Sequence, residues 1–199
     1  MRVTIIIPWI RKEKIGRAIT AATLNAGGEV LIYAKEDQDR IGCPKMVRDM
    51  VNNVQTDYVA FLGDDSIAAP GYIKYALEEM SQFSDDCGLI GFNDKTGRTL
   101  PTHWISHLDM LYKLDGEFFH CGYGHTCCDI ELMERVVAMG RFAYSEKSIV
   151  LHDHPLISGG DWDKNYKKVY SPEEMEKDHT LLIQRRNEGW PEEEQFLIP

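Results

Sequence analysis

The residues best suited to chemistry in this sequence are two neighbouring aspartates, Asp64 and Asp65, which follow the apolar run at residues 58–62. Adjacent carboxylates at the end of a buried strand repel each other unless a cation or a set of donors accepts their charge. Mg²⁺ and Mn²⁺ bind one or two such carboxylates and complete their shells with water and phosphate oxygens. The pair therefore predicts a metal site, while the alternative is a solvated loop in which Asp65 or Ser66 caps the following helix.

Two histidines end another strand-like run further along the chain. His152 and His154 flank Asp153 directly after residues 149–151. Alternate side chains of a strand share one face, so both imidazoles can point toward the same site. The structural alternative for either residue is a histidine in a turn, bonded to backbone.

The elements that must position these residues alternate along the first half of the chain. Apolar runs predict strands at residues 3–7, 30–33, 58–62 and 88–92, with helices between them. We expect Pro8 to end the first strand and Pro70 to be the first residue of the third helix. This alternation predicts an α/β fold with a mostly parallel sheet flanked by helices.

The second half of the sequence is less regular. Residues 102–119 show no clean period and predict no element. Helical spacing returns at residues 130–137 and ends at Gly140, and a short strand is expected at 149–151. The run Ser171-Pro172-Glu173-Glu174 has the form of a capping box and predicts a final helix that ends near residue 188, followed by a tail at 191–199.

Composition narrows the classes of protein that this chain can be. With 199 residues and 43% hydrophobic content, it can close one core but not two comfortable ones. A net charge of −10 argues against broad nucleic-acid binding. We find no apolar run of membrane-spanning length and no secretory signal. The five cysteines lack the paired spacing of structural zinc modules, so a zinc site is a weaker interpretation of them than free thiols. We therefore expect a soluble, cytoplasmic protein with free thiols.

Several segments, in their order and spacing, resemble family 2 glycosyltransferases of the GT-A fold. The first three are MRVTIIIPW, EVLIYAKED and TDYVAFLGDDSIAAPGYI. A later one, CDIELMERVVAMGRFAYSEKSIVLHDHP, resembles the part of that family in which an acidic pair opens a helix, a glycine follows, and a strand ends in histidine. The resemblance spans about residues 3–155.

The resemblance implies a single-domain, Rossmann-like GT-A fold and an inverting transfer from a nucleotide-diphosphate sugar, such as a UDP sugar, to a hydroxyl acceptor on a saccharide, lipid or protein. It implies that residues 1–92 bind the nucleotide, that 93–170 hold the acceptor and the catalytic groups, and that 171–199 form a C-terminal helix and tail. The implied cofactor is Mn²⁺ or Mg²⁺, bound by Asp65 with Asp64 near the ribose or the metal waters. His152 matches the family's metal-facing histidine better than His154 does.

The resemblance also suggests roles for other residues. Asp129 falls on the acid that removes the acceptor proton, and Glu131 is a second candidate for that base. Trp104 lies where a sugar ring would stack, although core packing is the commoner role of a single tryptophan. Guanidinium groups grip phosphate in a bidentate fork. The candidate nucleotide contacts are Pro8, Trp9, Arg11, Glu36, Asp37, Arg48 and Asp64.

Two positions depart from the family pattern. Gly63 and Cys128 stand where the family places the first acid of each acidic motif. These departures prompt one alternative, a GT-A-like domain that binds a nucleotide sugar without catalysis. A nucleotidyltransferase is another alternative, but that class opens with a glycine-rich loop after its first strand, and PWIRKEK has no glycine.

Overall fold

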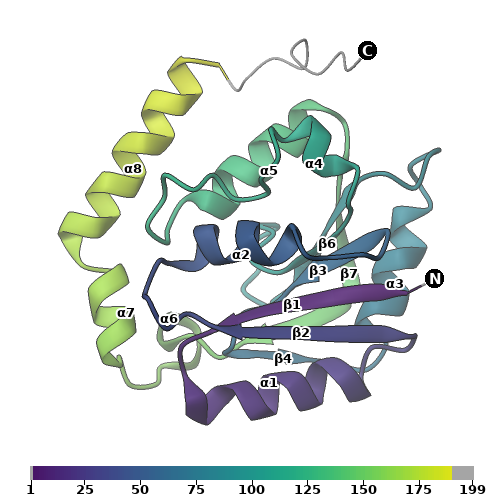
Figure 1. The fold of residues 1–199 in the computed structure, drawn as a ribbon, viewed down its shortest axis with the longest axis horizontal. Coiled ribbons are helices and arrows are strands. Elements are labelled where there is room, and N and C mark those ends of the chain that lie inside the picture. The colour runs from purple at the N-terminus through teal and green to yellow at the C-terminus, as the bar shows by residue number, and fades with distance from the viewer. Residues whose placement is uncertain (1, 190–199) are drawn as a thin grey trace.

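The computed structural model describes residues 2–189, so the expected tail at 191–199 lies outside the described residues. Strands in this part of the chain form one mixed sheet in the order β2-β1-β3-β6-β5-β7-β4 (Figure 1). The strands are β1 (Val3–Trp9), β2 (Val30–Glu36), β3 (Tyr58–Phe61), β4 (Ser66–Ala68), β5 (Leu89–Asn93), β6 (Trp104–His107) and β7 (Phe142–His152). All but β4 and β6 run in the same direction, which confirms the expected α/β fold with a mostly parallel sheet.

Helices cover both faces of this sheet, and each face carries its own apolar cluster. One cluster joins α2, α4 and α5 to strand residues such as Ile6 and Val59, and the other joins α1 and α3 to alternate strand residues such as Ile5 and Ala60. Figure 1 shows α1 and α2 on opposite sides of β1 and β2. The helices are α1 (Lys12–Leu24), α2 (Cys43–Val51), α3 (Tyr72–Met80), α4 (Met110–Lys113), α5 (Cys128–Ala138), α6 (Pro155–Ser158), α7 (Lys164–Val169) and α8 (Pro172–Asn187).

The two prolines that were expected to mark element boundaries lie slightly off them. Pro8 is inside β1, which continues to Trp9. The Trp9 carbonyl accepts a hydrogen bond from Asp37 N–H on the β2 side of β1, so the backbone nitrogen of Pro8 faces the β3 side. Pairing of β1 with β3 ends at Ile6, and β1 therefore needs no N–H donor at position 8. Helix α3 begins at Tyr72 rather than Pro70, because its N-cap Gly71 has a left-handed φ of 82° that a right-handed helix cannot contain.

The second half contains elements that the sequence left unassigned. Residues 102–119 include β6, which pairs antiparallel with both β3 and β5, and the short helix α4. Strand β7 is much longer than the expected run at 149–151, and its pairing with β5 shifts register between Phe92 and Asn93. The predicted cap of the last helix is confirmed, since Ser171 Oγ accepts from Glu174 N–H at 3.4 Å. Among residues 2–189 no helix has both the length and the apolar character needed to cross a membrane.

Candidate functional site

A cavity of about 470 Å³ lies at the carboxyl ends of β1 and β3. This is the edge at which open α/β sheets bind their ligands. The loops after β1 and β3, the start of α5, the end of β7 and helix α7 all contribute to its wall. Polar residues in that wall include Arg11, Asp37, Asp64, Asp65, His103, Asp129, His152, His154, Tyr166 and Tyr170.

Asp64 connects the ends of β1 and β3. Its Oδ2 accepts hydrogen bonds from the backbone N–H groups of Ile10 and Arg11, each at 2.9 Å, and its Oδ1 accepts from Arg11 Nη1 at 2.5 Å. Burial raises the pKa of Asp64, against the lowering effect of Arg11. Because protein donors already occupy both oxygens, Asp64 positions Arg11 and the loop after β1 rather than presenting an open carboxylate.

Asp65 contacts three residues through one of its oxygens. His152 Nε2 lies 3.4 Å from Asp65 Oδ2, Arg11 Nη1 lies 3.6 Å from the same atom, and the Tyr166 hydroxyl donates a hydrogen bond to it. Burial would raise the pKa of Asp65, but His152, Arg11 and Tyr166 outweigh it and hold that pKa well below its usual range. The carboxylate is therefore ionised and able to bind a cation.

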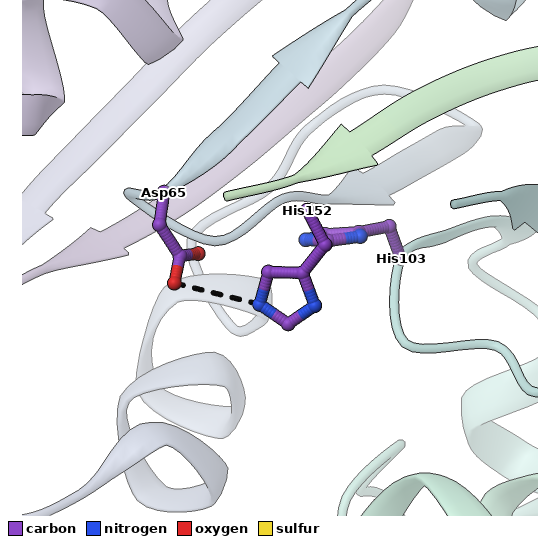
Figure 2. Close-up of side chains that lie close together, drawn as sticks. All are labelled: Asp65, His103 and His152. Atoms are coloured by element: carbon purple, nitrogen blue, oxygen red, sulfur yellow. Dashed lines mark ion pairs between the residues drawn. The ribbon is translucent and has the colours of Figure 1, made fainter. Parts of the chain in front are cut away.

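Two histidines lie beside Asp65 (Figure 2). Asp65, His103 and His152 each offer a ligand atom, and these atoms all lie within 4.8 Å of one another. Burial lowers the pKa of His103 to about 3, whereas Asp65 raises the pKa of His152 against the effect of burial. A carboxylate with two imidazoles is a donor set that suits a divalent metal ion, and His103 Nδ1 is buried with no hydrogen-bond partner among residues 2–189.

His154, the other predicted metal ligand, belongs to an aromatic cluster. Its ring centroid lies 5.2 Å from that of His152, and it packs edge-on against Trp162, Tyr166 and Tyr170. Burial, with the charge of His152, lowers its pKa to about 4. The structure groups His152 with Asp65 and leaves His154 outside the set of three potential ligands.

The two candidate bases on α5 occupy different surroundings. Asp129 lines the cavity, and burial raises its pKa. Glu131 is 1% exposed and does not line the cavity. Its carboxylate accepts from Tyr123 Oη at 2.8 Å and from Arg185 Nε and Nη2 at 2.7 Å each, which ties α5 to α8. Only Asp129 therefore faces the space that a substrate could enter.

The other predicted contacts are divided between the cavity and the rest of the molecule. Pro8, Trp9 and Arg11 line the cavity, as does Asp37, whose carboxylate accepts from the backbone N–H groups of Ile41 and Gly42 at 2.8 and 3.0 Å. Three residues do not line it: Glu36 and Arg48 are exposed, and Trp104 is fully buried against Phe61, Phe118 and Phe119 in the core.

The sequence did not reveal the roles of His103 and α7. Arg11 pairs with Asp163 at 2.9 Å, and its guanidinium carbon lies 4.0 Å from the centre of the Tyr166 ring. These contacts join residues 152 and 155 positions apart, so no local periodicity could signal them. His103 lies in a segment without a clean period, and its neighbour Trp104 was the more conspicuous candidate.

Sequence comparison identifies no relatives, because no family model matches this chain and no curated protein matches it. Solved structures do match. The structure of Staphylococcus aureus TarS 1–349 in complex with UDP has a TM-score of 0.59 at 14% identity, covering 96% of this chain and 73% of that one.

Two further structures contain a metal. Glucosyl-3-phosphoglycerate synthase from Mycobacterium tuberculosis, in complex with Mn²⁺, UDP and phosphoglyceric acid, matches with a TM-score of 0.57 at 13% identity, over 79% of this chain and 73% of that one. A mutant of Drosophila β-1,4-galactosyltransferase 7, in complex with manganese, UDP-Gal and xylobiose, gives 0.58 at 10% identity, over 85% and 79%. Residues 2–189 thus adopt the fold of the GT-A glycosyltransferases.

Proposed function

We propose that this protein is a metal-dependent glycosyltransferase that moves a sugar, with inversion, from a nucleotide-diphosphate sugar to a hydroxyl acceptor on a saccharide, lipid or protein. In this proposal residues 1–92 bind the nucleotide and residues 93–170 supply the acceptor site and the base. The observation that carries it is the placement of Asp65 and His152 in one cavity wall and Asp129 in the same cavity, on a GT-A fold.

A buried arginine in the cavity wall offers a cation to a diphosphate. Arg11 is 8% exposed, and its ion pairs with Asp64 and Asp163 fix its guanidinium beside Asp65. An arginine side chain that is already held in place loses little conformational freedom when a phosphate binds to it. Asp65 and His152 would hold Mn²⁺ or Mg²⁺ there, and the ion would supply positive charge against the negative charge that develops on the leaving diphosphate.

Asp129 supplies the base in this proposal. It removes the proton from the acceptor hydroxyl as the sugar is transferred, and such general-base catalysis contributes about 10²- to 10⁴-fold to a rate. Its position in the first turn of α5 leaves its carboxylate at the cavity wall. The described cysteines are all free, in keeping with a cytoplasmic protein.

The test is a calorimetric titration with UDP, with and without Mn²⁺, on the wild type and on Asp65→Asn. We expect Mn²⁺ to strengthen UDP binding at least tenfold in the wild type and to have no such effect in Asp65→Asn, because the variant loses the charged ligand. The matched control is Asp57→Asn, an exposed aspartate at the other end of β3. Equal Mn²⁺ dependence in Asp65→Asn and the control would refute the metal site.

Product analysis separates the enzymatic alternatives. A glycosyltransferase incubated with UDP-sugar and Mn²⁺ releases UDP, by slow hydrolysis even without the acceptor, whereas a nucleotidyltransferase consumes a nucleoside triphosphate and releases pyrophosphate. Metal-dependent UDP binding without turnover of any donor, unchanged by Asp129→Asn, would instead support a domain that binds without catalysis.

A further inference from the structure

Gly63, directly before the two aspartates, leaves no room for a side chain. A Cβ atom at this position would lie 2.7 Å from Asp65 Oδ1 and 3.4 Å from His103 Nε2. The first of these distances is shorter than any ordinary contact of a carbon atom. The space in which an acid at position 63 would project is therefore already taken by the Asp65 carboxylate and the His103 imidazole.

The two oxygens of Asp65 differ in what surrounds them. His152, Arg11 and Tyr166 all contact Oδ2. Oδ1 is the oxygen that a Cβ atom added at Gly63 would approach, and it lies on the side of His103. The carboxylate thus has one oxygen bound by protein donors and another on the side of the His103 imidazole.

His103 itself is buried without a complete set of partners. It is 2% exposed, and its Nδ1 has no hydrogen-bond partner among residues 2–189. The ring stacks on Phe61 with an interplanar angle of 21° and meets the His152 ring at 80°, with centroids 4.9 Å apart. Figure 2 shows the two imidazoles close together, with Asp65 to one side of them and a dashed line marking its ion pair with His152. The other ring nitrogen, Nε2, is the one that a Cβ atom at Gly63 would approach to 3.4 Å, and ligand atoms of Asp65, His103 and His152 lie within 4.8 Å of one another.

The geometry points to His103 as a third protein ligand, which completes a two-histidine, one-carboxylate set for a transition-metal dication in preference to Mg²⁺. This inference rests on the proposed function, since it concerns the metal at the same edge of the cavity. Imidazole nitrogen suits ions such as Co²⁺ and Zn²⁺, whereas Mg²⁺ prefers oxygen ligands. The histidine contributed by the segment before β6 compensates for the absence of an acid at Gly63.

Metal titrations in the absence of nucleotide test this inference. The wild type is titrated with Co²⁺, followed by its visible absorption, and with Mg²⁺ by calorimetry. We expect tighter binding of Co²⁺ than of Mg²⁺, and we expect His103→Asn to weaken Co²⁺ binding by about tenfold or more, since even residues outside the ligand shell are worth about 10- to 100-fold in affinity. The matched control is His179→Asn, an exposed histidine on α8, which should bind Co²⁺ like the wild type.

The outcomes are separable. Co²⁺ affinity that falls in His152→Asn but not in His103→Asn would overturn this inference and leave the metal-dependent function standing. A wild type that binds neither Co²⁺ nor Mn²⁺, alone or with UDP, would remove both. If His103→Asn fails to fold, ¹⁵N shifts of the wild-type imidazoles still decide: Zn²⁺ should move the ring nitrogens of His103 together with those of His152, and unmoved His103 signals would overturn the inference.

Discussion

Helix α5 carries one acid at its start, which faces the cavity, and another on the face that packs on α8. The two carboxylates differ in the donors and cations that bind them. Asp129 Oδ1 accepts a hydrogen bond from the adjacent Ile130 N–H at 3.0 Å, and no cation within residues 2–189 pairs with it. Glu131, two residues later and on another side of the helix, is bound by Tyr123 and Arg185. A carboxylate whose lone pairs are filled stabilises the fold, whereas one that is left open can act on a ligand.

The pKa shifts of these acids follow from the same difference. Burial raises the pKa of Asp129, because the backbone hydrogen bond from Ile130 offsets only part of the loss of water. Burial also acts on Glu131, but hydrogen bonds from Arg185 and Tyr123 outweigh it and lower that pKa. An acid whose burial is only partly compensated is costly to the folded state, and such costs concentrate at functional sites.

A second compensated acid supports this contrast. Asp178 of α8 accepts hydrogen bonds from the backbone N–H groups of Gly124, His125 and Thr126, at 2.7, 3.0 and 2.7 Å. Those three residues lead into α5. Helix α8 therefore holds the segment that positions Asp129, through carboxylates that take no part in the cavity themselves.

The largest expected effect is on catalysis by Asp129→Asn. Loss of the base should lower kcat by about 10³-fold, within the usual range for general-base catalysis. Donor affinity should stay within about twofold, since Asp129 carries no ligand charge in the proposal. The measurement is steady-state turnover of a nucleotide sugar alongside calorimetric binding of UDP and Mn²⁺. A variant with wild-type kcat would show that the open acid is not the base.

A smaller effect, on stability, is expected from Glu131→Gln. Removing one partner of a buried ion pair costs about 3 kcal/mol in the free energy of unfolding, because Arg185 and Arg135 are left without their shared anion. Chemical denaturation measures this. The matched control is Glu134→Gln on the same helix, which pairs with the more exposed Arg186 and should cost less than about 1 kcal/mol. Equal losses in the two variants would contradict the contrast between buried and exposed pairs.

The smallest expected effect is a difference between the pH at which kcat falls and the pH at which the fold is lost. Because the folded-state pKa of Asp129 is raised, kcat at saturating donor should fall on acidification before the pH reaches the ordinary aspartate pKa of about 3.9. Because the folded-state pKa of Glu131 is lowered, its contribution to stability is present above the unfolded pKa of about 4.3 and is lost as pH falls through the lower folded value.

Activity should therefore be lost at a higher pH than the fold. Turnover and circular dichroism across one pH series would test this order, with UDP and Mn²⁺ affinity followed in parallel, because protonation of His152 would weaken binding rather than kcat. Simultaneous loss of kcat and ellipticity would count against Asp129 as a raised-pKa base.

Much of the fold could be predicted because its elements carry local signals. The strands at the core of the first half are continuous apolar runs, and the helix capped by Ser171 begins with a side chain that binds its own backbone. The positions of Asp65 and His152 followed from the same logic, since strand ends can be read from the runs that precede them. Strand β6 could not be predicted, because it is an antiparallel insertion of four residues between β3 and β5 and its pairing partners are distant in sequence.

By itself, then, the sequence determined where the acids and His152 stand relative to the strands, because hydrophobic period and helix caps act over a few residues. Only the tertiary structure decided which of these side chains are bound by donors from other segments. Asp64 is bound by Arg11, Glu131 by Arg185 and Tyr166 binds Asp65, across separations of 53, 54 and 101 residues. It also turned Trp104 into the core and left His103 at the cavity. The chemistry of a carboxylate depends on its donors, and donors brought from distant segments leave no mark in the local pattern.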